Sequence, residues 1–298
     1  MKPFMIKVPA SSANIGPGFD SVGIALERYL TLTVTPGEDW EFKHRSPLLP
    51  EVPNHEEHFI FKIASKIAAK HGKELSSASI SVDTEIPLAR GMGSSASAII
   101  AGIELANRLA ELDLTAEQKL RHAVQIEGHP DNVAPALFGG FITAVQFEQE
   151  LDYLILPELD VDLIVYIPDF ELKTEDARRV LPDAYPRAVA TRASAISSMM
   201  IAAFMKGDYN LAGRMMERDL FHETYRARLI PRYDEIKPEA RELGAYATVI
   251  SGAGPTTISF APSGKGEEIA RRMQSLLPDY EIAALRIDTE GLQVSDLD

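Results

Sequence analysis

The sequence predicts a protein of mixed helix and strand class, α/β or α+β, built as two domains. Its 298 residues are about twice the ~150 residues of a typical domain. Hydrophobic residues make up 45% of the chain, enough for substantial cores, and strand patterns are interleaved with helix patterns throughout. Because the character of the sequence changes after about Pro157, we expect one domain over residues 1–155 and a second over 156–298.

Alternating β-branched and aromatic residues that end at Pro or Gly predict strands in the first domain. This pattern occurs over residues 4–10, 29–37, 78–87 and 139–147. Apolar residues at helical spacing predict helices over 56–72, 94–112 and 114–128. In the third helix, Thr115 and Gln118 fit a capping box and Gly128 fits the end.

The second domain is predicted to be richer in helices. Helices are expected over residues 174–182, 186–207, 208–220 and 265–278. Strands are expected over 161–168, over 247–262 as two strands around a glycine-rich turn, and over 280–288. The methionine pairs at 199–200 and 215–216 are expected to fill the core, because methionine adapts to irregular gaps.

Composition excludes several classes of protein. A formal net charge of -14 argues against general nucleic-acid binding, which needs a basic face. The chain has no cysteine, so disulfides, thiolate metal sites and cysteine nucleophiles are excluded. The N-terminus lacks the apolar region of a secretory signal, and no stretch approaches ~18 uninterrupted apolar residues. We therefore expect a cytoplasmic protein without a membrane span.

The stretch IPLARGMGSSASA, over residues 86–98, combines bare backbone with hydroxyl groups at the start of a helix. Gly91 and Gly93 have no Cβ, so a ligand can approach the backbone closely. The first N–H groups of the helix have no intrahelical partner and lie at the positive end of its dipole, an arrangement that binds phosphate. Ser94 and Ser95 add hydroxyls that could bind phosphate oxygens or magnesium.

Other interpretations of this stretch exist. A glycine turn followed by a serine cap would need no ligand. The spacing also satisfies the G-x-G-x-x-G/A pattern of dinucleotide-binding proteins, but that fold needs a further strand after the helix, where this sequence has another helix. A Walker loop is excluded, because no Gly-Lys-Ser/Thr follows.

Three further stretches are rich in Gly, Pro, Ser and Asn: VPASSANIGPGFDSVGIAL over 8–26, EGHPDNVAPALFGG over 127–140 and ISGAGPTTISF over 250–260. Together with the glycine loop, they resemble the motifs of the GHMP small-molecule kinases. The resemblance covers nearly the whole chain, and four motifs in order make it specific. Their form is most similar to that of members which phosphorylate the side-chain hydroxyl of L-homoserine. Met92, where the family usually has Leu, conserves volume.

The resemblance implies an α+β fold. The N-terminal domain would be an ATP-binding domain like domain 2 of ribosomal protein S5, and the C-terminal domain would be ferredoxin-like. It also implies transfer of the ATP γ-phosphate to homoserine in threonine biosynthesis, with ATP and Mg²⁺ bound, and a homodimer.

The resemblance assigns the ATP phosphates to backbone groups of one loop, with no lysine assisting. That loop comprises Pro87, Leu88, Ala89, Arg90, Gly91, Met92, Gly93, Ser94, Ser95, Ala96 and Ser97. Glu127 is the implied carboxylate ligand of magnesium, and Ser95 is its hydroxyl partner, with Ser94 as the alternative. One carboxylate, one hydroxyl and phosphate oxygens suit this ion.

The acceptor residues also follow from the resemblance. Asn132 would contact the reacting hydroxyl and is assigned to catalysis together with Glu127; His129 would contact the substrate. Homoserine is a zwitterion, so its ammonium needs a carboxylate and its carboxylate needs a cation, preferably a guanidinium. Asn14 and Asp20 match the first substrate-binding motif of the family, with Asp20 as the partner of the ammonium, and Arg178 and Arg226 resemble its carboxylate-binding arginines.

Some assignments stay open. Arg179 and Arg228 are the neighbouring structural alternatives to the two arginines, and Asp131 could serve as a general base, which we do not assign. The Ser251–Pro255 turn is expected to pack against the phosphate loop and support it. Rival functions are a GHMP kinase with another acceptor, a catalytically silent relative and a dehydrogenase.

Overall fold

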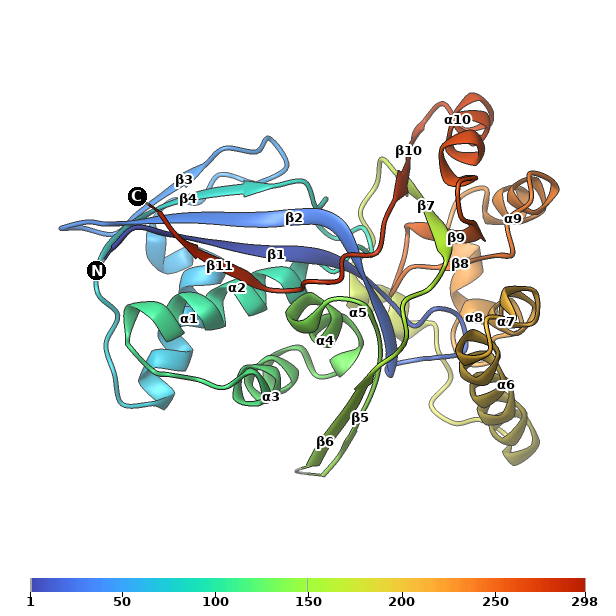
Figure 1. The fold of residues 1–298 in the computed structure, drawn as a ribbon, viewed down its shortest axis with the longest axis horizontal. Coiled ribbons are helices and arrows are strands. Elements are labelled where there is room, and N and C mark those ends of the chain that lie inside the picture. The colour runs from blue at the N-terminus through green and yellow to red at the C-terminus, as the bar shows by residue number, and fades with distance from the viewer. Residues whose placement is uncertain (1, 149, 298) are drawn as a thin grey trace.

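The computed structural model of the protein describes residues 2–148 and 150–297, and contains two sheets side by side (Figure 1). The first sheet contains β1 (Phe4–Ala13), β2 (Val22–Pro36), β3 (Glu41–His44), β4 (Ala78–Thr84), β5 (Phe141–Phe147), β6 (Glu150–Ile155) and β11 (Gln293–Asp296). The second contains β7 (Val161–Pro168), β8 (Ala247–Ile250), β9 (Thr257–Pro262) and β10 (Tyr280–Leu285).

Helices α1 (Phe59–Lys70), α2 (Ser94–Leu109), α3 (Ala116–Glu127) and α4 (Pro130–Phe138) cover one face of the first sheet (Figure 1). The second sheet is accompanied by α5 (Thr174–Arg179), α6 (Arg187–Met205), α7 (Tyr209–Met216), α8 (Glu223–Arg226), α9 (Tyr233–Glu242) and α10 (Gly266–Leu276). Single 3₁₀ turns occur at η1 (His55–Glu57) and η2 (Ala227–Leu229).

The first sheet has the order β11-β1-β2-β4-β3. Strand β5 pairs with the first residues of β2, Val22–Ile24, and also with β6. Most pairs are antiparallel, whereas β3 and β4 are parallel. Helix α2 is buried along most of its length between the sheet and its neighbouring helices, because small residues such as Ala96, Ala101 and Gly102 allow close packing. This packing fixes the position of the glycine loop that precedes α2.

The second sheet has the order β10-β7-β9-β8 and is antiparallel throughout. With helices between β7 and β8 and α10 between β9 and β10, this is the βαββαβ arrangement of the ferredoxin-like fold. Strand β7 is buried on both faces: Leu163 and Val165 join the main core, while Ile164 and Tyr166 pack with residues of α9 and α10. The predicted α+β, two-domain fold is confirmed.

Several local predictions hold and others do not. The capping box of Thr115 with Gln118 and the left-handed Gly128 at the end of α3 are both present. The sequence patterns missed β3, β6, β11, α4, α8 and α9, and β2 begins at Val22 rather than at residue 29. The β6 strand ends at Ile155, but β11 belongs to the first sheet although it lies in the range 156–298.

Helix α6 differs most from expectation. Met200, Met215 and Met216 are buried as predicted, but Met199 is 47% exposed, because one face of α6 is not covered by the described chain. Among the described residues, α6 is also the one helix long and apolar enough to cross a membrane, which is weak evidence by itself. It carries Arg187 and Arg192, and its other face packs against α7.

Candidate active site

A cavity of about 540 Å³ lies where the two sheets meet. Its wall is formed by the glycine loop, the turn between β1 and β2, the start of α4, helices α5 and α8, and the turn between β8 and β9. All four sequence motifs therefore reach one cavity. We call the part beside Ser95 and Glu127 the nucleotide end, and the part lined by Asp20, Arg178 and Arg226 the acceptor end.

The glycine loop presents backbone N–H groups to the cavity. Gly91 and Gly93 have φ values of 75° and 69°, which non-glycine residues rarely adopt. No side chain caps α2, and its first intrahelical bond joins the Ser97 N–H to the Gly93 carbonyl. The N–H groups before Ser97 are therefore available to an anion at the positive end of the helix.

The structure divides the eleven predicted loop residues into two groups. Six line the cavity: Leu88, Ala89, Gly91, Gly93, Ser94 and Ser95. The other five hold the loop in place: Met92 and Ala96 are buried, the Ser97 hydroxyl donates to the Pro9 carbonyl at 2.8 Å, and Arg90 donates to the Pro168 carbonyl at 3.1 Å, with Pro87 buried beside them.

Ser95 and Glu127 meet at the nucleotide end. The Ser95 hydroxyl, in the first turn of α2, donates to a Glu127 carboxylate oxygen at 2.9 Å, at the last residue of α3. Burial raises the pKa of the Glu127 carboxyl, and the hydrogen bond from Ser95 offsets this only in part. An oxygen pair beside a phosphate-binding helix end fits the donor set that Mg²⁺ prefers.

Asp20 and Arg178 face each other at the acceptor end. The Arg178 guanidinium donates to both Asp20 oxygens, at 2.8 and 3.2 Å. Asp20 has a φ of 54°, and its N–H donates to the Asn14 side-chain oxygen at 3.0 Å. The Asn14 amide in turn donates to the Gly252 carbonyl at 2.9 Å, so Asn14 holds the Asp20 loop in position and lines the cavity.

Arg226 lines the same end but is only 2% exposed. Its guanidinium donates to the carbonyls of Ala177 and Gly252, at 3.0 and 3.1 Å. Burial, followed by the charge of Arg178, lowers the pKa of Arg226 to about 10, so it is still cationic at neutral pH.

The alternative arginines lie elsewhere. Arg179 is exposed and pairs with Asp176 and Glu175, and Arg228 is exposed and does not line the cavity.

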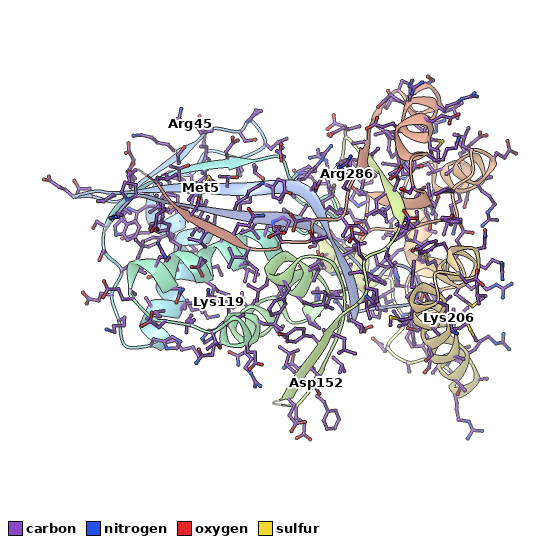
Figure 2. The ribbon with its side chains drawn as sticks, viewed as in Figure 1. Met5, Arg45, Lys119, Asp152, Lys206 and Arg286 are labelled. Carbon is purple, nitrogen blue, oxygen red and sulfur yellow. The ribbon has the colours of Figure 1, made fainter. Side chains whose placement is uncertain are left out.

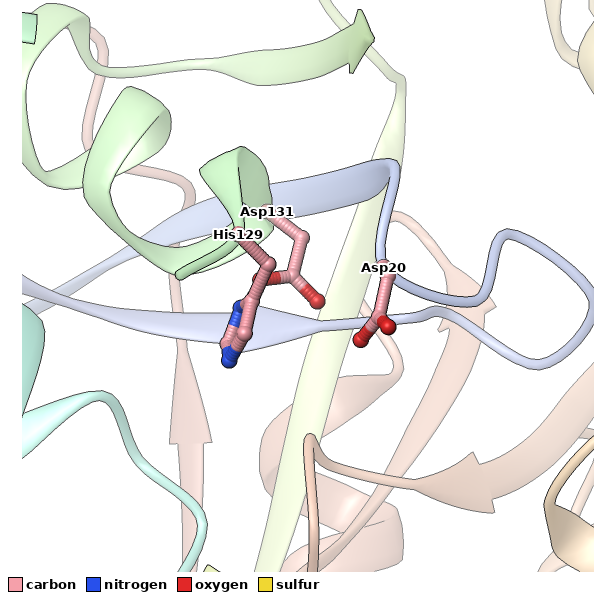
Figure 3. A group of neighbouring side chains, drawn as sticks. All are labelled: Asp20, His129 and Asp131. Atoms are coloured by element: carbon pink, nitrogen blue, oxygen red, sulfur yellow. The ribbon is translucent and has the colours of Figure 1, made fainter. Parts of the chain in front are cut away.

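The stretch over residues 127–140 contains the start of α4. Asp20 lies opposite His129 and Asp131 (Figure 3), and their ligand atoms are within 4.8 Å of one another. His129 Nδ1 contacts the buried Asp131 carboxylate. Burial lowers the pKa of His129, but the hydrogen bond and charge of Asp131 outweigh it and raise the pKa overall. Asn132 accepts a hydrogen bond from the Ser11 hydroxyl at 2.9 Å.

The Ser251–Pro255 turn packs against the glycine loop and supports it, as predicted. The Ser251 hydroxyl lies 2.5 Å from the Gly91 carbonyl, to which it can donate, and 2.8 Å from the Ser12 hydroxyl. A Cβ on Gly91 would lie 2.4 Å from the Ser251 carbonyl oxygen, so only glycine permits this approach.

Sequence reasoning missed Phe19, which packs behind the two arginines, and one part of the cavity wall. Phe19 lies beside both arginines, with its ring centroid 5.7 Å from the Arg178 guanidinium and 5.4 Å from that of Arg226. The GPGFD stretch of the first motif contained this signal. The missed part of the wall is apolar and extends beyond the glycine loop, where it is lined by Leu49, Pro50, Val52, Phe59, Ile60 and the His44–His58 pair. This region had no motif to mark it.

The fold and the cavity are those of a small-molecule kinase. The family model described as the GHMP kinases N terminal domain matches residues 58–140, and the one described as GHMP kinases C terminal matches 200–279.

The chain is 49% identical over 298 residues to a homoserine kinase of Oceanobacillus iheyensis, with 99% of this chain and 100% of that protein covered. It is 45% identical to the homoserine kinase of Bacillus licheniformis, over 98% and 95% of the two proteins. A crystal structure of homoserine kinase from Cytophaga hutchinsonii is 26% identical and superposes with a TM-score of 0.85, covering 99% of this chain and 98% of that one. The chain therefore belongs to the GHMP kinase family, in the group of its homoserine kinases.

Proposed function

We propose that the protein transfers the γ-phosphoryl group of ATP to the side-chain hydroxyl of L-homoserine, forming O-phospho-L-homoserine for threonine biosynthesis. The observation that carries this proposal is the acceptor end of the cavity. A carboxylate, Asp20, and two guanidinium groups, Arg178 and Arg226, line it together beside a phosphate-binding loop. A zwitterionic amino acid is the acceptor that such a pair of opposite charges would select.

The nucleotide lies across the glycine loop. Its polyphosphate accepts hydrogen bonds from the N–H groups at the start of α2, and the loop contains no lysine. The adenosine occupies the apolar region near Leu49, Val52 and Phe59, where the wall offers the hydrophobic surface that ligand pockets use for ring systems. This placement points the γ-phosphate toward Asn132.

Ser95 and Glu127 are the residues that would hold Mg²⁺ with the nucleotide, where the ion would neutralise part of the phosphate charge. Their contact at 2.9 Å keeps the hydroxyl and the carboxylate together at the mouth of α2. Glu127 must be ionised for this role, and its raised pKa brings protonation closer to neutral pH than for an ordinary glutamate.

Homoserine enters between Asp20 and Arg178. Its ammonium group binds Asp20 and its carboxylate binds Arg178 and Arg226, replacing the ion pair that these side chains form with each other. His129 contacts the substrate, and Asn132 orients the reacting hydroxyl. Phosphoryl transfer has a loose transition state, so positioning and charge stabilisation supply most of the acceleration and no general base is assigned.

We further propose that the enzyme acts in the cytoplasm as a homodimer, on small molecules rather than on nucleic acid or membranes. The net charge of -14 supports the exclusion of nucleic acid.

A coupled assay of ADP release tests the function. With Mg²⁺ and ATP, homoserine should be turned over with a kcat/KM at least 100-fold above those for mevalonate, galactose and shikimate. Preference for any of the other three would replace the acceptor, while absence of turnover with all four would refute the proposal.

A further inference from the structure

Three ionisable side chains are buried behind the acceptor end of the cavity. Charged residues such as Asp152 and Lys206 lie at the surface (Figure 2). In contrast, Asp219, His222 and Arg226 are at most 5% exposed. His222 has no exposed surface and does not line the cavity, so it does not reach the substrate. Burying a polar group is unfavourable unless it is hydrogen-bonded, so the contacts of His222 indicate what it does.

The two ring nitrogens of His222 contact two different parts of the acceptor end. Nε2 lies 2.9 Å from the carbonyl oxygen of Gly16, in the turn between β1 and β2, and Nδ1 lies 3.4 Å from a guanidinium nitrogen of Arg226. Burial lowers the pKa of His222, although the charge of Asp219 opposes this, so the ring is neutral at neutral pH and carries one proton. A carbonyl only accepts and a guanidinium only donates. The proton is therefore on Nε2, and Nδ1 accepts from Arg226.

The turn between β1 and β2 needs such contacts because its backbone is strained. Asn14, Ile15 and Asp20 have φ values of 71°, 47° and 54°, in a region that a β-branched residue such as isoleucine rarely adopts. Such conformations persist only where the surrounding structure holds them. Figure 1 shows the turn reaching from the first sheet to α7 and α8, and a Cβ on Gly16 would lie 2.3 Å from a backbone oxygen of α7. The position of Asp20 therefore depends on contacts with the second domain, including the one with His222.

Helix α8 also depends on this histidine. It has only four residues, Glu223–Arg226, and a helix this short is not stable by itself. The Asp219 carboxylate accepts from the backbone N–H groups of His222 and Glu223, at 2.7 Å each. The Arg226 N–H donates to the His222 carbonyl at 2.9 Å. The backbone and the ring of His222 together therefore determine where Arg226 lies.

An aromatic stack joins these parts. The His222 ring lies against the Phe19 ring, with centroids 5.3 Å apart and planes inclined by 20°. The guanidinium carbons of Arg226 and Arg178 lie 5.4 and 5.7 Å from the centroid of the same Phe19 ring, a distance at which cations are attracted to aromatic faces. His222, the turn and both arginines therefore form one packed group.

We propose that His222 is a positioning residue for the acceptor. Its Nε2–H holds the turn that carries Asp20, and its Nδ1 holds the Arg226 guanidinium. One rigid ring thereby fixes the carboxylate and the cation relative to each other, as recognition of a zwitterion requires. This inference rests on the proposed function, in which the ammonium of homoserine binds Asp20 and its carboxylate binds Arg226.

The tautomer of His222 can be tested in the wild-type protein. Long-range ¹H–¹⁵N correlation spectra at neutral pH should show a neutral ring that is protonated on Nε2. A charged ring or an Nδ1–H tautomer would overturn the proposal, because neither leaves an acceptor for Arg226. This measurement needs no variant, so the proposal can fail even if a substitution at this position prevents folding.

Two amide variants separate the two ring nitrogens. His222→Gln keeps a donor near the position of Nε2 but loses the acceptor for Arg226. The KM for homoserine should rise about 10-fold, the effect expected for loss of one hydrogen bond to a charged group, while the KM for ATP stays unchanged. L-Homoserine methyl ester has the ammonium but not the carboxylate, so this variant should not weaken it. The ester is measured by kcat/KM, or by its Ki against homoserine if it is not phosphorylated.

His222→Asn has the opposite pattern. It keeps an acceptor near the position of Nδ1 but loses the donor to Gly16, so the Asp20 turn is released. Because homoserine and its methyl ester both place an ammonium on Asp20, both should weaken equally, by about 10-fold. His122→Gln is the matched control for the two variants, since His122 is also buried but contacts Lys70 and His71, away from the acceptor end.

A purely structural role for His222 would give a different result. In folded His222→Gln protein, verified by thermal unfolding, an unchanged homoserine KM would overturn the proposal. An equal loss for homoserine and the ester, or an equal rise in the KM for ATP, would do the same. If the wild type phosphorylated none of the acceptors, the proposed function would fail, whereas the tautomer of His222 would still be decided by its spectrum.

Discussion

The nucleotide end and the acceptor end of the cavity differ in whether their polar groups already have partners. At the nucleotide end, backbone N–H groups at the start of α2 have no partner within the helix. At the acceptor end, charged groups pair with each other, as Asp20 does with Arg178. The phosphate site is therefore preformed, whereas the acceptor must replace an existing ion pair. Only a molecule that carries both charges replaces both partners, so the pair favours amino acids over neutral alcohols.

Glu127→Ala should have the largest effect, because it removes the carboxylate proposed to hold Mg²⁺. We expect kcat to fall by about 10³-fold, as when a group that stabilises transition-state charge is lost, while the KM for homoserine changes little. Steady-state kinetics at saturating MgATP measure this. Glu117→Ala, at an exposed residue of the same helix, is the control. A change confined to the homoserine KM would contradict the division into two ends.

Arg178→Met should act on the acceptor alone. Loss of a charge-assisted pair costs roughly 1.5–3 kcal/mol, so the KM for homoserine should rise about 10–100-fold without a change in the KM for ATP. Arg179→Met is a matched control, because its side chain points to Glu175 and Asp176 instead. Equal effects of the two variants would refute a binding role for Arg178.

Arg226→Met should raise the homoserine KM by about 10-fold or more and also lower Tm. Unlike Arg178, Arg226 donates to the backbone carbonyls of Ala177 and Gly252, and its loss removes these two buried hydrogen bonds, although Gly252 keeps the one from Asn14. Differential scanning calorimetry should separate the two arginines, with Arg228→Met as the exposed control. If Arg178→Met lowered Tm as much as Arg226→Met, the proposed difference between the two arginines would be wrong.

The smallest expected effect concerns pH. Glu223 accepts hydrogen bonds from the Ile250 N–H and the Tyr233 hydroxyl, and burial raises its pKa from 4.5 to about 7. The native state therefore holds this proton more tightly than the unfolded chain, and stability decreases as pH rises from about 4.5 to about 7.

The Glu223→Gln variant has no ionisable group at this position, so it lacks this pH-dependent loss of stability. Its Tm should exceed that of the wild type by roughly 3 °C at pH 8, and the difference should vanish near pH 5. Thermal unfolding across this range checks the prediction. A difference independent of pH would show that Glu223 does not titrate in the native protein.

The glycine loop could be predicted because its requirements are local. Gly91 and Gly93 adopt conformations that other residues avoid, and the capping box of α3 is set by two side chains three positions apart. Such features are encoded within a few residues, and sequence patterns detect them.

Helix α4 could not be predicted in the same way. It contains Pro135, which has no N–H to give to the Asp131 carbonyl. That carbonyl instead lies against the backbone of Gly23, where a Cβ would come within 1.7 Å of its oxygen. The buried state of Arg226 likewise depends on residues far away in the sequence, such as Ala177 and Phe19. These features arise from tertiary contacts that no local pattern records.

The position of strand β11 has a consequence for the synthesis of the protein on the ribosome. It pairs Gln293–Asp296 with Lys7–Phe4 and covers the outer edge of β1 (Figure 1). While the ribosome is still translating, the hydrogen-bonding groups along that edge have no protein neighbour, and an open edge invites pairing with other nascent chains. The amino-terminal sheet is completed only when residues 293–296 have emerged from the exit tunnel, so a product truncated before residue 293 would keep this edge open and be prone to aggregation.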